Sequence, residues 1–173
     1  MEEFMEYLVK KQQTSKDTML KCLIIAAAFI LAVAVYIIFS SIPLIAFLGL
    51  FAAAAVIYGA WKLIKSFNIE YEYILTSHDL DVDRIIAKSR RKRLVSIDLR
   101  NIEIMAPVSE KYRHEYENDG IKEKFNASTG DASTEYFIKF SHKEKGHALL
   151  LFNPCESVVK FCKHAAPRKV FDA

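Results

Sequence analysis

The chain has 173 residues, which is enough polypeptide for one ordinary domain with extra segments. Its formal net charge of +3 is too small to indicate nucleic-acid binding by itself. Its three cysteines are odd in number and lack CxxC spacing, which argues against a disulfide framework or a zinc knuckle. Apolar residues make up 52% of the chain but are unevenly distributed, so each segment has to be considered separately.

Residues 1–18 are predicted to form a cytoplasmic amphipathic segment. In the stretch MEEFMEYLVKKQQ, apolar side chains recur near i, i+4 spacing, and the acidic residues precede the lysines, an order that the helix dipole favours. We therefore expect a helix there. Two placements are open: the helix lies on the inner leaflet of a membrane, or it packs on the cytoplasmic domain.

Residues 19–65 are predicted to form a two-helix transmembrane hairpin. Two apolar runs, about 19–39 and 44–64, are separated by the sequence SSIP, and no Asp, Glu, Lys, Arg or His occurs from Cys22 to Trp61. A helix needs roughly 20 apolar residues to cross a membrane, so this interval fits two spans. Neither run has the polar stripe of a helix in a soluble protein, and the second run follows too soon for the first to be a cleaved signal peptide.

The orientation of the hairpin follows from its flanking lysines. The loop between the two runs carries no charge, whereas lysines precede the first run and close the second: Lys10, Lys11, Lys16 and Lys21, then Lys62 and Lys65. The positive-inside rule therefore places both termini and the C-terminal domain in the cytoplasm, with the hairpin in the cell membrane. No ionisable residue lies deep in either run, which argues against a proton relay, an ion pathway or a transporter site.

Two local features of the hairpin lead to further expectations. Pro43 suits the start of the second helix, because its missing N–H would have no partner there in any case. Ala55 and Gly59 form a small-xxx-small pair, which allows two helices to approach closely. We interpret this pair as a contact within the hairpin rather than between copies of the chain.

Residues 66–173 are predicted to form a cytoplasmic domain of seven short strands followed by one helix. From Ile69 onward the apolar pattern changes to a period of two, which indicates strands. The charged stretch 109–120 is expected to be a loop, and residues 142–146 a hairpin turn. The expected strands, each bounded by turn sequences, are residues 69–76, 80–86, 91–97, 101–106, 122–128, 136–141 and 147–152.

A helix is expected after the last strand. Asn153 has the chemistry of an N-cap, Pro154 suits the first helical turn, Glu156 completes the capping pattern, and Pro167 ends the helix. A run of strands followed by one helix contains no alternation of strand and helix. We therefore expect an α+β domain rather than a doubly wound parallel sheet.

The opening of this domain resembles that of bacterial PH-like domains, in which a Y-x-L-T-x-x-x-L strand pair precedes a basic third strand and an I-x-L-x-x-I segment. The matching positions are Tyr73, Leu75, Thr76 and Leu80, then Arg90 to Arg93, then Ile97, Leu99 and Ile102. The resemblance implies a PH-like, seven-stranded antiparallel β-barrel or sandwich closed by a C-terminal helix. The whole chain is also similar to a family of small two-span membrane proteins of Gram-positive bacteria. It departs from the pattern in having Ser89 where a turn glycine is often found.

The candidate binding site is a basic cluster that would contact an anionic surface. It consists of Arg84, Lys88, Arg90, Arg91, Lys92 and Arg93. On a strand, Arg91 and Arg93 share one face while Arg90 and Lys92 share the other. Each Lys or Arg near an anionic leaflet contributes about 1 kcal/mol of binding free energy. Two other interpretations are open: a solvated strand whose charge only fixes topology, and a protein-binding surface. Nucleic acid is not expected, because aromatic residues do not interleave the cluster.

Enzymatic chemistry is not expected. The five histidines are scattered outside any HExxH or CxxC context, and no GxSxG, P-loop or GxGxxG sequence occurs. Asp79, Asp81 and Asp83 alternate, but the further ligands and the glycine of a calcium loop are missing. We interpret these three as a solvated acidic strand face, and we predict no catalytic residue, metal site or cofactor.

The sequence therefore predicts a non-enzymatic, membrane-anchored adaptor that presents a PH-like domain at the cytoplasmic face and binds a protein partner or an anionic lipid surface. The alternative is an accessory subunit of a membrane enzyme or transporter that interacts through the transmembrane hairpin. Neither the identity of the ligand nor the oligomeric state follows from the sequence.

Overall fold

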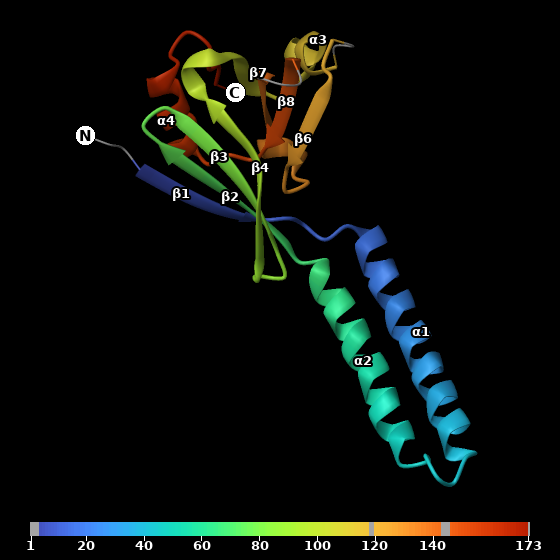
Figure 1. Ribbon diagram of the computed structural model, residues 1–173. Helices are drawn as coiled ribbons and strands as arrows, with labels where there is room; N and C mark the ends of the chain where they lie inside the picture. The colour runs from blue at the N-terminus through green and yellow to red at the C-terminus, as the bar shows by residue number, and fades with distance from the viewer. Residues whose placement is uncertain (1–3, 118–119, 143–145, 173) are drawn as a thin grey trace. The chain divides into compact units, whose positions relative to one another are not determined.

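The structure is a computed structural model that describes residues 4–117, 120–142 and 146–172. The chain divides into two compact units (Figure 1). One unit comprises residues 13–68, and the other joins the segment up to Gln12 with the chain from Ile69 onward. The helical unit is therefore an insertion between the first strand and the remainder of the β domain.

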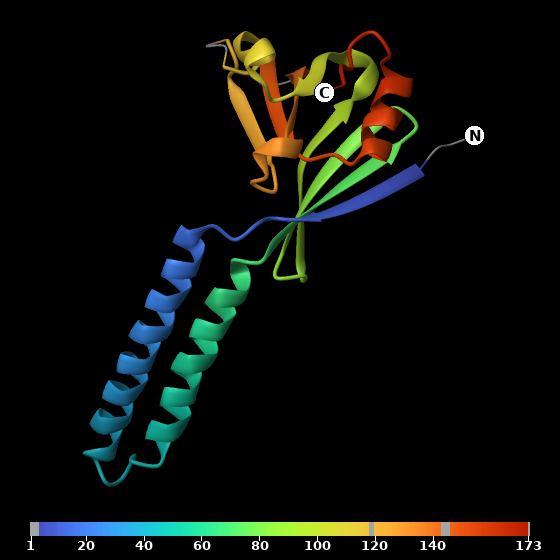
Figure 2. The ribbon, with the colours of Figure 1, turned by 180° about the vertical axis from the view of Figure 1, so that it is seen from behind.

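The helical unit contains α1 (Ser15–Ser40) and α2 (Leu48–Ser66), which lie side by side in both ribbon views (Figures 1 and 2). Within the described residues, these two helices are long and apolar enough to cross a membrane. A capping box between Thr14 and Asp17 starts α1. The prediction that Pro43 opens the second helix was wrong, because turns continue to Phe47 and α2 begins at Leu48.

The two helices pack through a seam of less exposed residues spaced three or four apart. On α1 these are Ile24, Ala28, Ala32, Val35 and Phe39, and on α2 they are Gly49, Ala53, Val56, Ala60 and Ile64. The helices approach closely at Gly49, where an added Cβ atom would lie 2.9 Å from the Cβ of Phe39. Ala55 and Gly59 are exposed and lie off this seam, so the prediction that they join the two helices was wrong.

The β domain contains eight strands in the described part of the chain, in two four-stranded sheets. The first sheet has the order β1-β2-β3-β4 and is antiparallel throughout, and the second has the order β5-β7-β8-β6. The strands are β1 (Phe4–Lys10), β2 (Ile69–Thr76), β3 (Asp79–Ile86), β4 (Arg90–Asp98), β5 (Ile102–Pro107), β6 (Glu123–Ala127), β7 (Tyr136–His142) and β8 (Gly146–Phe152). The seven strands expected from the sequence correspond to β2 through β8.

The N-terminal stretch is a strand, so the prediction of a helix was wrong. Phe4–Lys10 pairs along its whole length with β2, with Val9 opposite Tyr71 and Lys10 opposite Glu70. Met5, Tyr7 and Val9 turn toward the core, and this alternation fits a strand as well as the i, i+4 spacing fits a helix. Pairing decides between the two, because without β1 the long edge of β2 would be left open.

Two further expectations about the β domain need correction. The second sheet is not wholly antiparallel, because β6 pairs with β8 in parallel. Of the two architectures expected, a barrel or a sandwich, the closed seven-stranded barrel is not formed, because the strands make two separate sheets. The core between the sheets includes Tyr73 and Phe152, whose rings meet edge to face at 5.4 Å. The predicted hairpin turn at 142–146 falls largely outside the described residues.

The stretch 109–120, expected to be a loop, contains a 3-10 turn, η2 (Glu110–Tyr112), and a one-turn helix, α3 (Arg113–Tyr116). Tyr112 and Tyr116 pack against Phe137 on the outer face of the second sheet. This segment therefore covers an apolar face that would otherwise be exposed.

The last helix, α4 (Glu156–Ala165), packs on the main core through Val158, Phe161 and Cys162, and Figure 2 shows it beside the first sheet. Its N-cap is Cys155, so the predicted cap at Asn153 was wrong.

Asn153 instead has a buried role. Its side-chain oxygen accepts hydrogen bonds from Ser128 Oγ and Thr129 N, and its amide nitrogen donates to Asp131 O and Thr134 Oγ1. It thus fixes the loop after β6 against the end of β8.

Candidate functional site

All six residues of the basic cluster lie on the hairpin formed by β3 and β4. The hairpin turns at Ala87, Lys88 and Ser89, where Ser89 N donates to Ile86 O over 3.1 Å. Ala87 and Lys88 have φ angles of 55° and 56°, in the left-handed region that costs a non-glycine residue about 1–2 kcal/mol. The turn expected from the sequence therefore forms without glycine, and it carries backbone strain.

A β-bulge decides where the arginines of β4 point. Val95 lies opposite Val82 on the core face, but the register shifts between Val82 and Asp83, so that Arg93 lies opposite Asp83 on the outer face. Without the bulge, strict alternation would place Arg93 on the same face as Val95. The register confirms that Arg91 and Arg93 share one face while Arg90 and Lys92 share the other.

On the outer face, Arg91 and Arg93 are paired with acidic residues of the same sheet. An Arg91 Nη lies 2.5 Å from Glu72 Oε2, and an Arg93 Nη lies 2.5 Å from Asp81 Oδ2. Arg93 Nε also donates a hydrogen bond to Asp83, and this bond raises the pKa of Arg93 above its ordinary value.

Of the three aspartates predicted to form a solvated face, Asp79 is exposed and Asp81 is half-buried, but Asp83 is only 3% exposed, so the prediction was wrong for Asp83. Glu72, the partner of Arg91, is also buried, with 8% exposure. Glu72 also lies directly opposite Asp83 on the neighbouring strand, where two like charges repel. Arg91 and Arg93 therefore neutralise charges that the fold has buried. The sequence contained a signal for this pairing, since Glu70 and Glu72 alternate with the core tyrosines of β2.

Arg84 points to the core side of the sheet rather than to a surface. It lies opposite Tyr71 on β2 and Lys92 on β4, and it is half-buried. Burial raises the pKa of Tyr71, and the nearby positive charge of Arg84 partly offsets that rise. Arg84 is thus poorly placed to contact a flat surface.

Three cations of the cluster remain available at the end of the hairpin: Lys88, Arg90 and Lys92. All three are exposed, and none forms an ion pair with another residue in the described part of the chain. We call these three residues the basic tip. Of the six residues in the cluster, these three are the ones that are both exposed and without an ion pair in the described part of the chain.

The register also places the basic tip at one particular end of the first sheet. Ile86, at the start of the turn, pairs with Ile69, the first residue of β2. Lys11 N donates to Ile69 O at 3.0 Å, so β1 ends at the same end of the sheet at which β2 begins. Only Phe67 and Asn68 separate Ile69 from the end of α2. The tip thus lies at the sheet end at which the chain leaves for, and returns from, the helical insertion.

Two hollows are present elsewhere in the β domain. One of about 610 Å³ is lined by residues that include Asp79, Asp98, Asn101 and His142. The other, of about 540 Å³, lies beside α4 and is lined by residues that include Lys160 and Lys163. No group of three or more His, Cys, Asp or Glu residues within the described ranges is arranged to hold a metal ion.

Comparison with known protein families gives a match that extends over almost the whole chain. The family model of the bacterial PH-like domain, DUF6106, matches residues 1–172. No curated protein and no solved structure matches the chain. Because the family model spans the segment before the helices, the helices and the β domain, the chain belongs to the bacterial PH-like domain family DUF6106.

Proposed function

We propose that this protein is a non-enzymatic binding module of the cell membrane, in which α1 and α2 span the bilayer and the PH-like domain contacts the anionic cytoplasmic leaflet through its basic tip. The observation that carries this proposal is the position of the tip. Three exposed, unpaired cations lie at the sheet end that leads directly into both apolar helices.

Strand pairing supports the proposed topology independently of the flanking lysines. The strands β1 and β2 are hydrogen-bonded neighbours in one sheet, and both apolar helices are inserted between them. The segments before α1 and after α2 must therefore lie on the same side of a membrane. An even number of crossings meets this requirement, and the lysines at both ends of the insertion favour the cytoplasmic side.

The expected strength of the tip contact is modest and suits a tethered domain. Three cations at about 1 kcal/mol each give roughly 3 kcal/mol at an anionic surface. A free domain would bind only weakly with that energy, but a domain held by a membrane anchor meets the lipid at high effective concentration. The contact should weaken as ionic strength rises, because both partners are exposed to solvent.

Energy transfer in nanodiscs tests this contact with the full chain. A donor dye is attached to cysteine in a Ser89→Cys variant in which Cys22 and Cys155 are serine, and the acceptor is a headgroup-labelled lipid. We expect transfer to rise when phosphatidylglycerol replaces a zwitterionic lipid, and to fall again at high salt.

The matched variants are Lys88→Gln/Arg90→Gln/Lys92→Gln and a control with the same charge change at Lys111, Lys124 and Lys160, which are exposed elsewhere on the domain. Only the tip variant should lose the dependence on anionic lipid. Transfer that is unaffected by anionic lipid in the parent protein would refute the proposal.

A second function, as an accessory subunit that binds through the hairpin, is favoured by one observation. Ala55 and Gly59 lie off the α1–α2 seam, and no described atom outside the helix backbone lies within 4 Å of a Cβ built at Gly59. A third helix can approach closely at such a position. Crosslinking and affinity capture from the native membrane should then recover a membrane partner with the parent chain but not with Gly59→Leu. Equal recovery with both would exclude this surface.

A further inference from the structure

The edge of the second sheet is covered by the last described residues of the chain. Strand β5 is the edge strand, and Met105 at its centre hydrogen-bonds on its outer side to the segment after α4. Met105 N donates to Lys169 O over 2.8 Å, and Phe171 N donates to Met105 O over 2.8 Å. Val170 therefore forms an isolated parallel β-bridge with Met105, and we call the segment Lys169–Asp172 the C-terminal strap.

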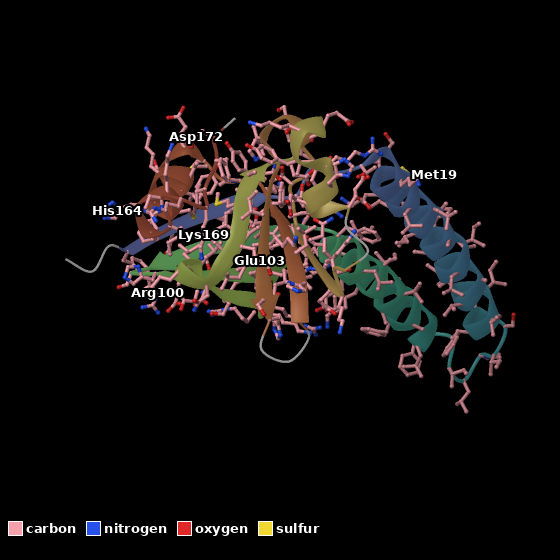
Figure 3. All side chains as sticks on the ribbon, turned by 90° about the horizontal axis from the view of Figure 1, so that it is seen from above. Met19, Arg100, Glu103, His164, Lys169 and Asp172 are labelled. Atoms are coloured by element: carbon pink, nitrogen blue, oxygen red, sulfur yellow. The ribbon has the colours of Figure 1, made fainter. Side chains whose placement is uncertain are left out.

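Each side chain of the strap has its own contact, and Figure 3 labels the two ends, Lys169 and Asp172. Lys169 Nζ donates to Arg100 O at 2.8 Å, and Val170 is buried in the main core with 4% exposure. The ring of Phe171 lies 5.9 Å from that of Tyr112 but remains 42% exposed. The strap thus has an aliphatic anchor followed by a half-exposed aromatic residue.

The strap ends at a hollow whose lining includes two lysines, Lys160 and Lys163, and the acidic residue Glu156, which forms an ion pair with Lys160. The carboxylate of Asp172 forms an ion pair with Lys163, and both residues line the hollow of about 540 Å³ beside α4. Lys160 lies one helical turn before Lys163, and Ser133 and Thr134 supply hydroxyl groups on another wall. Val159, Pro154 and Tyr136 make the lining partly apolar. The observed occupant of this hollow is thus a single carboxylate, that of Asp172, held by Lys163.

The contacts that hold the strap are individually weak. The two backbone hydrogen bonds both go to one residue, Met105, and a hydrogen bond contributes about 0.5–1.5 kcal/mol net. The ion pair joins side chains that are 47% and 54% exposed, and such pairs contribute about 0–1 kcal/mol. Only Val170 is fully enclosed. An extended segment with the same pattern could therefore replace the strap, because sheet edges accept added strands.

We propose that the β5 edge, together with the hollow beside α4, is a binding site for an extended segment of a partner protein that carries a carboxylate at one position, and that the C-terminal strap is its resident occupant. The partner segment carries an aliphatic residue in place of Val170, an aromatic residue in place of Phe171 and a carboxylate in place of Asp172. This site shares no residue with the basic tip, so it does not depend on the proposed lipid contact.

The test uses the membrane-embedded chain in zwitterionic nanodiscs, where the tip has no anionic lipid to bind. The probe is a fluorescent peptide with the sequence PRKVFDA, taken from residues 167–173. A chain ending at Arg168 should bind this peptide saturably, and at least tenfold more tightly than the intact chain, in which the tethered strap competes. A peptide with aspartate in place of the valine should not bind.

Matched variants locate the site. In the shortened chain, Lys160→Gln/Lys163→Gln should weaken peptide binding about fivefold or more, whereas Lys111→Gln/Lys124→Gln should not change it. Absence of binding to a shortened chain whose β7 and β8 amides keep their protection from hydrogen exchange overturns the proposal.

If the shortened chain loses that protection, the full-length variant Phe171→Ala/Asp172→Asn replaces it, because Val170 is retained. This variant should bind the peptide more tightly than the intact chain, and equal binding overturns the proposal. Either result leaves the lipid experiment unaffected, so the two proposals fail separately.

Discussion

Two groups of cations on the same β3–β4 hairpin have different surroundings. Arg91 and Arg93 are paired with acidic residues that the first sheet has buried, whereas the basic tip of Lys88, Arg90 and Lys92 has no acidic partner in the described chain. From Arg90 to Arg93 the residues of the two groups alternate in the sequence. The comparison teaches that a run of basic residues on a strand contributes to two faces of the sheet. Only the basic residues on the face without buried acids are left without an acidic partner.

The largest expected effect that follows from this comparison is that of Arg93→Gln. It removes the positive charge beside Asp81 and Asp83, and Asp83 is 3% exposed. We expect a loss of about 2–3 kcal/mol in the free energy of opening of the first sheet, below the range for a fully buried pair because Arg93 is half exposed. Hydrogen exchange of β2–β4 measures this quantity. Adding Asp83→Asn should restore most of it; a single variant as stable as the parent would contradict the pairing.

The corresponding change at Arg91 should have a smaller effect. Arg91→Gln leaves Glu72 without its ion pair, but Arg91 is more exposed than Arg93 and contacts Asp83 only at 3.9 Å. We expect a loss of about 1 kcal/mol by the same hydrogen-exchange measurement. A loss equal to that of Arg93→Gln would show that the two arginines act as one network rather than as separate pairs.

A third change tests whether the turn is strained. Ala87 has a φ of 55°, so Ala87→Gly should relieve strain and stabilise the hairpin by about 0.5–1 kcal/mol. Thermal unfolding in nanodiscs, compared with that of the parent chain, measures the gain. A loss of stability would mean that the Ala87 side chain contributes contacts that outweigh the strain.

The smallest expected effect on stability belongs to the basic tip. Replacing Lys88, Arg90 and Lys92 together with glutamine should change the free energy of unfolding by less than about 0.5 kcal/mol, because exposed residues without partners contribute little. The same variant should abolish the dependence of energy transfer on anionic lipid. A large loss of stability without a change in lipid dependence would reverse the comparison.

Much of the fold could be predicted because its signals are local. The long apolar runs indicate α1 and α2, and alternation with turn residues indicates β2 through β8. The prediction failed for β1, where the spacing of Phe4, Met5, Leu8 and Val9 fits a helix while Met5, Tyr7 and Val9 also alternate. Only pairing with β2, more than fifty residues away, decides between the two.

For the basic cluster, the sequence predicted which arginines share a strand face but not which of them have acidic partners. The alternation of Arg91 and Arg93 was correct, yet the bulge that gives them acidic partners depends on how two strands align, and no single segment encodes it. Asn153 was mistaken for a helix cap because its buried partners, such as Ser128, come from a distant loop. The positions of Ala55 and Gly59 likewise depend on which helix face meets α1.

The insertion of both helices between β1 and β2 has a consequence for biosynthesis. The first strand leaves the ribosome before either apolar helix, and the strand with which it pairs follows only after both. The sheet therefore cannot start to assemble at this edge until the entire insertion has been translated. Pairing of the two helices then brings the strand ends together and lowers the entropy cost of closing this long loop. A chain in which the two helices failed to pair would leave the edges of β1 and β2 open, and open strand edges promote aggregation.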